Sequence, residues 1–198
     1  MDRRWLAALG LVAVGLVAGW SAAKSQAPPG DKSGPEPAPA PHQAADRDGP
    51  LETIDWLVGD WASADGEVTA EVSGNFTKND AFLVRSFRIA GKEDARLSGM
   101  QVIAWDPARK TIRSWTFDSR GGFGEETWSQ SGNRYTIRTK YTLPDGGLGS
   151  ALNVMTYVDD DKCTWKSINR EIDGVFQPDT DEIVLTRKPR AGVAKGGE

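Results

Sequence analysis

Two arginines alternate with aromatic residues in a pattern that brings cationic and apolar side chains to one surface. In the run LVRSFRI, Arg85 and Phe87 share one face of an expected strand. In IRSWTFD, Arg113, Trp115 and Phe117 do the same. The planar guanidinium fork matches a carboxylate or phosphate and is costly to bury without a partner. If both faces point inward, they would bind an amphipathic molecule such as a fatty acid, with its head on arginine.

The orientation of these two strands decides whether the arginines meet a ligand. In the alternative, the opposite faces point inward and both arginines lie on the outer surface. The residues that would then face the interior are Phe82, Val84, Ser86, Ile112, Ser114 and Thr116. Two further aromatic residues, Phe123 and Tyr135, are expected at the wall or mouth of the same cavity.

A glycine-rich loop with three nearby carboxylates offers a second kind of chemistry. In DSRGGFGE the glycines permit positive φ and close backbone approach, which suits either a barrel mouth with Phe123 as its lid or a plain hairpin turn. Asp118, Glu125 and Glu126 would serve acid–base catalysis if a cleft separated their pKa values; otherwise they are solvated turn residues. An enzyme would use Asp118 or Glu125 as general base and an arginine to hold an oxyanion.

The counts of reactive residues exclude several kinds of site. The chain has one cysteine, Cys163, and one histidine, His42, which precedes the expected folded part. An intramolecular disulfide, a multi-thiolate metal site and a Ser-His-Asp triad are therefore excluded, and we expect no metal and no cofactor. Cys163 alternates with Trp165 and is expected to be a small buried hydrophobe. The net charge of -4 argues against nucleic acid as a partner.

The elements that would position these residues are short β-strands. From Asp60 onward, turn signals such as Asp106-Pro107 and Gly121-Gly122 separate segments rich in Val, Ile, Thr and aromatic residues. Short strands at this spacing, without intervening helices, indicate an antiparallel meander. We predict an all-β fold, an antiparallel up-and-down β-barrel of about nine or ten strands, because closure removes exposed strand edges. A short N-terminal helix is expected in LETIDWLVG.

The part of the chain before the barrel divides into a leader and a spacer. Residues 1–23 have a basic start, an apolar run and the small residues SAA, which together predict a signal peptide and export to the periplasm or outside the cell. The alternative is an uncleaved membrane anchor, which needs roughly 20 apolar residues. Residues 24–49 are rich in proline and alanine and predict a disordered linker. The barrel is expected over residues 50–189 and a disordered tail over 190–198.

Residues near the two ends of the expected barrel carry a family resemblance. Gly59-Asp60-Trp61 is a G-x-W motif at the start of the first strand, and Arg187 lies on the last strand in IVLTRKP. This pair resembles the signature of lipocalins and the wider calycin barrels, in which the tryptophan closes one end and a basic residue packs across it. The resemblance implies those parts for Gly59, Trp61 and Arg187, and a guanidinium does stack well on an indole face.

A wider resemblance covers roughly residues 51–189. The runs IDWLVGDW, TKNDAFLVRSF, GMQVIAWDP, IRSWTFDSRGGFGE and TYVDDDKCTWKS look like an uncharacterised bacterial lipocalin-like domain. In related proteins that domain often follows a SnoaL-like domain. Here only the proline-rich stretch precedes the expected barrel, so no activity of a SnoaL-like domain is carried over. The resemblance brings no established reaction.

These observations predict a barrel that binds a small apolar or amphipathic molecule without catalysis. One alternative is a hydrolase- or isomerase-type enzyme built on a cavity carboxylate and an arginine. Another is a ligandless barrel that mediates protein–protein interaction in the cell envelope. A membrane is an expected partner only if the N-terminal segment stays uncleaved.

Overall fold

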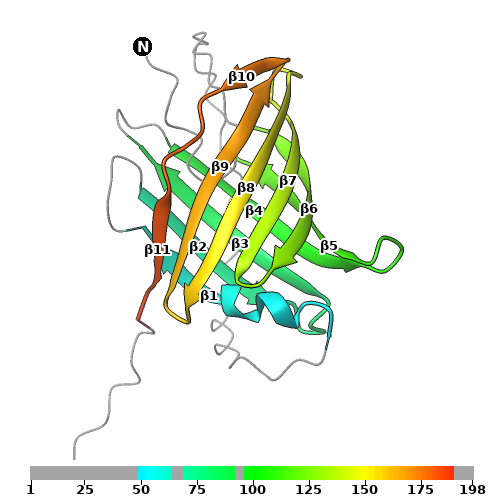
Figure 1. Ribbon diagram of the computed structural model, residues 1–198, viewed down its shortest axis with the longest axis vertical. Helices are drawn as coiled ribbons and strands as arrows, with labels where there is room; N and C mark the ends of the chain where they lie inside the picture. The colour runs from blue at the N-terminus through cyan, green and yellow to red at the C-terminus, as the bar shows by residue number, and fades with distance from the viewer. Residues whose placement is uncertain (1–48, 64–68, 92–95, 190–198) are drawn as a thin grey trace, which may run out of the picture.

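Eleven strands and one 3-10 helix form the part of the chain that the computed structural model describes, residues 49–63, 69–91 and 96–189 (Figure 1). The helix η1 spans Glu52–Leu57. The strands are β1 (Gly59–Ala62), β2 (Thr69–Phe76), β3 (Phe82–Ala90), β4 (Arg96–Asp106), β5 (Thr111–Asp118), β6 (Phe123–Ser131), β7 (Arg134–Thr142), β8 (Leu148–Asp159), β9 (Lys162–Ile172), β10 (Val175–Gln177) and β11 (Ile183–Arg187). The expected leader, the linker up to residue 48 and the expected tail lie outside the described residues, as does His42.

The strands from β1 to β9 pair antiparallel with their neighbours in the order of the chain. β9 also pairs with β11, and β11 pairs with β1 through Arg187 and Trp61. These pairings close the sheet into an antiparallel barrel of ten strands, which confirms the predicted fold class. The short β10 pairs with the far end of β9, at the top of Figure 1, and lies outside the closed ring.

Side chains alternate between the interior and the outer surface along the strands, as the two-residue period of a β-strand requires. Val72 and Phe76 of β2 are buried, with exposed residues between and beside them. On β7, Tyr135, Ile137 and Tyr141 are buried in the same way. Each of these two strands therefore turns one apolar face to the core.

One end of the barrel is covered by η1 and by a stack of tryptophan and arginine. The guanidinium carbon of Arg187, on the last strand, lies 4.2 Å from the ring centroid of Trp61 on the first strand. The same guanidinium donates a hydrogen bond of 2.9 Å to the carbonyl oxygen of Trp56 in η1. Gly59 has a φ of +106°, and a Cβ atom there would lie 2.7 Å from Arg187 Nη1. A larger residue at position 59 would therefore collide with the stack.

The interior contains two apolar clusters. The first, called the cap-side cluster, packs against η1 and contains Ile54, Leu57, Phe76, Leu83, Ile103, Trp128, Tyr135, Ile137, Met155 and Trp165. The second, called the distal cluster, contains Trp61, Ala70, Val72, Phe87, Ile89, Leu97, Tyr141, Leu143, Cys163 and Leu185. On β3, β4 and β7, a polar inward residue separates a cap-side residue from a distal residue. The polar side chains between the two clusters are the interior groups best suited to bind a ligand or take part in a reaction.

Candidate functional site

A set of polar side chains lies inside the barrel between the two apolar clusters, and is called here the polar layer. It consists of Arg85, Gln101, Ser114, Thr116, Glu126, Thr139, Asn153 and Ser167. Strands β3 to β9 each contribute at least one of these residues. All except Gln101 are buried, and Gln101 is partly buried. Buried polar groups of this kind need partners, because an unmade hydrogen bond in the interior is costly.

Glu126 lies at the centre of a hydrogen-bond network in this layer. Its carboxylate accepts hydrogen bonds from Gln101 Nε2 at 2.6 Å, from Thr116 Oγ1 at 3.0 Å and from the Ser114 hydroxyl. Trp128 Nε1 donates to Ser114 Oγ at 2.8 Å. The strand register produces this arrangement, because Ser114 on β5 is the direct partner of Glu126 on β6.

Arg85 enters the same layer from β3. Its Nη1 donates to Gln101 Oε1 at 3.3 Å, so one amide links the buried guanidinium to the Glu126 carboxylate. Burial lowers the pKa of Arg85, opposed by the nearby Cys163 and Glu126. Burial raises the pKa of Glu126, opposed by its hydrogen bonds and by the Arg85 charge. The layer therefore holds a buried guanidinium and a buried carboxyl group that are joined through one amide.

Several polar atoms around this layer have no hydrogen-bond partner among the described residues. They are Arg85 Nε, Asn153 Oδ1, Ser167 Oγ and, beside the layer, Trp165 Nε1. Asn153 and Ser167 are register partners on β8 and β9, so their free oxygens lie on neighbouring strands. Leaving such an atom unpaired costs about 1–3 kcal/mol. Each of these atoms therefore keeps an unused hydrogen-bonding capacity inside the barrel.

The structure places Arg85, Phe87 and Tyr135 on inward faces, as the alternation predicted. Phe87 lies in the distal cluster, and Tyr135 lies in the cap-side cluster. The Tyr135 hydroxyl donates to the carbonyl oxygen of Thr53 and accepts from Trp56 Nε1 at 3.2 Å. Tyr135 thus anchors η1 to the barrel, away from the polar layer.

The inward direction expected for Arg113, Trp115 and Phe117 is wrong. On β5 the buried residues are Ser114 and Thr116, and Phe117 is 47% exposed. The guanidinium of Arg113 finds partners on the outer surface: it pairs with Glu125 at 2.8 Å and lies 5.1 Å from the Trp115 ring centroid. The physical reason is the neighbouring strand, because the hydroxyls of Ser114 and Thr116 are needed inside to satisfy the Glu126 carboxylate.

Of the other residues expected near the loop, Phe123 and Glu125 lie on the outer face, whereas Asp118 contacts the buried Tyr141. Phe123 is 49% exposed and is the register partner of Phe117 on the outer face. Glu125 points outward to Arg113. Asp118 shapes the loop by accepting the backbone N–H of Arg120 at 2.7 Å, and it also accepts the Tyr141 hydroxyl.

Of the three carboxylates near the loop, Glu126 is the buried one, whereas sequence reasoning favoured the other two as the base. The alternation of Gly124, Glu126 and Trp128 was the signal that could have identified it. Gln101, Thr139, Asn153 and Ser167 were missed entirely as candidate site residues. Each of them occupies an inward position of its strand, so the same alternation would have found them once the register was known.

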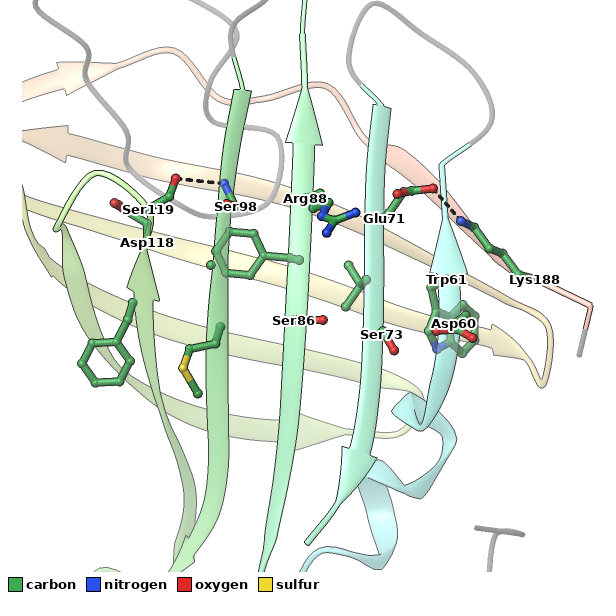
Figure 2. A pocket seen from close by; sticks show the side chains of 15 residues that line it. Asp60, Trp61, Glu71, Ser73, Ser86, Arg88, Ser98, Asp118, Ser119 and Lys188 are labelled. Atoms are coloured by element: carbon green, nitrogen blue, oxygen red, sulfur yellow. Dashed lines mark hydrogen bonds and ion pairs between the residues drawn. The ribbon is translucent and has the colours of Figure 1, made fainter. Parts of the chain in front are cut away.

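A second candidate region lies on the outside of the barrel and is called here the outer groove. It is a hollow of about 710 Å³ over β1 to β5, lined mainly by outward-facing side chains (Figure 2). Asp60, Ser73 and Ser86 are register partners in one row across it. In the figure, Glu71 and Lys188 are joined by an ion pair of 2.5 Å, which lowers the pKa of Glu71. Both of these side chains remain about half exposed to solvent.

The single cysteine is not part of a reactive centre. Cys163 is buried in the distal cluster, and burial raises the pKa of its thiol to about 11. A thiol of this kind is almost entirely protonated at neutral pH and is a poor nucleophile. This placement confirms the expected buried cysteine.

Searches for metal sites, for membrane-spanning helices and for related proteins add little to the assignment of a function. The described residues contain no group of three or more His, Cys, Asp or Glu side chains placed to hold a metal ion. Within the same residues, no helix has the length and apolar character needed to cross a membrane. The closed antiparallel barrel is consistent with a lipocalin-like barrel. No protein-family model matches the chain, and a search of curated proteins finds no significant match.

Proposed function

We propose that this chain is an exported barrel that binds a small amphipathic acid in its interior and performs no catalysis. The acid head would lie on Arg85 in the polar layer, and the apolar part would pack against the distal cluster. The observation that carries the proposal is the buried Arg85 guanidinium, whose Nε atom has no hydrogen-bond partner among the described residues. Export rests on the signal-peptide pattern of residues 1–23.

The chemistry of the free polar atoms favours an acceptor-rich head group. Three of the four atoms can donate: Arg85 Nε and Trp165 Nε1 are N–H donors, and the Ser167 hydroxyl can donate as well, whereas Asn153 Oδ1 accepts. A carboxylate accepts from several donors at once, and its bond to a guanidinium is both shorter and stronger than a neutral one. An anion at Arg85 would therefore offset the cost of burying this charge.

The neighbouring apolar residues favour a hydrocarbon tail. Phe87 and Ile89 follow Arg85 along the inward face of β3, and Leu97 lies opposite Ile89 on β4. A tail that runs from Arg85 along β3 would contact apolar side chains at each step. Burial of a methylene group contributes about 0.8 kcal/mol, so affinity should rise with chain length until the distal cluster is filled.

The resemblance to an uncharacterised bacterial lipocalin-like domain supports the same proposal at the level of the family. We propose that the barrel is a lipocalin-like domain of this kind. The interior of a small closed barrel is either filled by side chains or wide enough to hold one small ligand.

Calorimetric titration with decanoate and methyl decanoate tests the proposal. We expect the full chain to bind both, and Arg85→Gln to weaken decanoate about 10- to 100-fold, as for a lost hydrogen bond to a charged group, while leaving the ester unchanged. Arg113→Gln is the matched control, because Arg113 lies on the outer face. If Arg85→Gln fails to fold, Arg85→Lys can be measured in its place, because it keeps the positive charge and removes the guanidinium. Equal loss for acid and ester, or unchanged acid binding, would contradict the anchor role.

A second candidate function is an enzyme, favoured by one observation. Glu126 is a buried carboxylate whose pKa is raised by burial and which lies near a buried arginine. Such a pair has the elements of a general base and an oxyanion binder. Turnover of p-nitrophenyl butyrate that is lost in Glu126→Gln but kept in Glu125→Gln would favour this candidate. If p-nitrophenyl butyrate and decanoate are both recovered chemically unchanged after incubation with the protein, the binding function is favoured over the enzyme.

A further inference from the structure

The polar layer holds two buried ionisable groups, Arg85 and Glu126, and their combined charge affects the binding of any anion beside them. Gln101 is hydrogen-bonded to both Arg85 and Glu126, so one amide links the two buried side chains. This inference rests on the proposed function, because it concerns the binding of an acid at Arg85.

The groups that face Glu126 come from every strand around it. Ser114 and Thr116 on β5 and Gln101 on β4 donate hydrogen bonds to it, and Thr139 on β7 is its register partner. The ionisable groups whose charges interact with it or with Arg85 are Tyr141, Cys163 and, through Tyr141, Asp118.

Two of these neighbours stay neutral near neutral pH. The pKa of the Tyr141 hydroxyl is raised far above its ordinary value by burial and by the Asp118 carboxylate. The Cys163 thiol has a pKa of about 11, which burial causes. Asp118 ends β5, and its carboxylate accepts hydrogen bonds from the backbone N–H groups of Arg120 and Gly122 and from the Tyr141 hydroxyl rather than from a residue of the polar layer. Arg85 and Glu126 therefore set the charge of the layer.

The charge of the layer depends on whether Glu126 carries a proton. With Glu126 ionised, the Arg85 charge is already balanced, and an incoming carboxylate would leave one uncompensated negative charge in the interior. Such a buried charge is strongly unfavourable. With Glu126 protonated, the Arg85 charge has no counter-ion in the layer, and the ligand carboxylate restores neutrality.

We propose that Glu126 is a specificity-determining residue that takes up one proton from solvent for each carboxylate ligand bound at Arg85. The ligand stays an anion on the guanidinium, and Glu126 becomes neutral, so the bound layer carries no net charge. A protonated Glu126 can also donate a hydrogen bond, which the ionised form cannot. Acids are thus favoured at lower pH, whereas neutral analogues are bound independently of pH.

The linkage predicts a definite pH profile. Between the pKa of Glu126 in the free protein and its higher value in the complex, the association constant for decanoate falls tenfold per pH unit, because one proton is taken up. Glu126→Gln removes the charge and keeps an amide of similar shape. We expect this variant to bind decanoate more tightly than the wild type at the alkaline end of the range, with no pH dependence.

Calorimetric titration of the full chain with decanoate at each pH from 6 to 9, in phosphate and in Tris, measures the proton number directly. These buffers differ in ionisation enthalpy, so the difference in heat reports protons taken up. We expect close to one proton per ligand at some pH in this range for wild type and Glu125→Gln, and none for Glu126→Gln. Methyl decanoate should show none with any of these proteins.

Two outcomes separate this inference from the function on which it rests. Decanoate binding without proton uptake in the wild type, over the whole pH range, would overturn the inference and leave the binding function standing. Uptake that persists in Glu126→Gln would also overturn it, by assigning the proton to another group. No decanoate binding at all would overturn both. Absence of proton uptake in the wild type overturns the inference even if the glutamine variant fails to fold.

Discussion

The polar layer inside the barrel and the outer groove on its surface carry similar charged pairs in different surroundings. Inside, Arg85 and Glu126 are both buried and share one amide, Gln101. Outside, Lys188 and Glu71 lie 2.5 Å apart but remain about half exposed. An exposed ion pair contributes little, because water screens it and both side chains lose freedom. Burial removes that screening, so the inner pair dominates the local energetics.

The two regions also differ in how their polar groups are satisfied. The carboxylate of Glu126 has three side-chain donors fixed by the strand register. In the outer groove, Ser73 and Ser86 face solvent, which can satisfy their hydroxyls. A change in the layer should therefore affect the whole molecule, whereas a change in the groove should stay local.

The largest expected difference comes from removing each carboxylate. Glu126→Ala leaves the Arg85 charge uncompensated and three donors without an acceptor, so we expect a loss of about 3–5 kcal/mol in the free energy of unfolding. Glu71→Ala removes an exposed partner of Lys188 and should change little. Urea unfolding followed by tryptophan fluorescence measures both. Similar losses of unfolding free energy in Glu126→Ala and Glu71→Ala would show that the buried and the exposed carboxylate do not differ in their contribution to stability.

A smaller difference is expected from removing one hydroxyl in each region. Ser114→Ala deletes the oxygen that accepts from Trp128 Nε1 and donates to Glu126, so the free energy of unfolding should fall by about 1–3 kcal/mol. Ser86→Ala removes an exposed hydroxyl and should stay within about 0.5 kcal/mol of the wild type. Thermal melting of the two variants is the measurement. A larger loss for Ser86→Ala would contradict the account.

The pH dependence of stability should have opposite signs in the two regions. The pKa of Glu126 is raised in the folded state, so its contribution is present below the unfolded pKa and is lost as pH rises through the folded pKa. The pKa of Glu71 is lowered, so its contribution is present above the unfolded pKa and is lost as pH falls through the folded pKa.

Unfolding of the wild type, Glu126→Gln and Glu71→Gln at several pH values tests these signs. Relative to the wild type, Glu126→Gln should become more stable as pH rises. Glu71→Gln should be less stable than the wild type near neutral pH, and this difference should disappear as pH falls. The same slope for both variants would show that burial does not distinguish the two carboxylates.

The smallest expected effect is that of salt. At 1 M NaCl the Debye length is about 3 Å, so the difference between wild type and Glu71→Gln should shrink towards zero. The difference between wild type and Glu126→Gln should persist, because solvent ions do not enter the buried layer. Unfolding measurements at low and high salt provide the test. An equal salt effect on both differences would contradict the burial of the layer.

The closed all-β barrel could be predicted because alternation on β2 and β7 separates apolar from polar residues cleanly. Which face of β5 points inward could not be predicted, since Arg113, Trp115 and Phe117 form the more apolar of its two faces. That face turns outward because of hydrogen bonds between β5 and β6. Ser114 and Thr116 satisfy Glu126 on β6, and no pattern within β5 alone contains this information. Glu126 itself was hidden among turn carboxylates until the register placed it beside Trp128 on the inward face.

The most direct test of the central claim is a crystal structure of the full chain with bound decanoate. We expect the carboxylate to lie within hydrogen-bond distance of Arg85 Nε in the polar layer, with the tail along Phe87 and Ile89. A carboxylate found instead in the outer groove, beside Arg88 or Lys188, would contradict it.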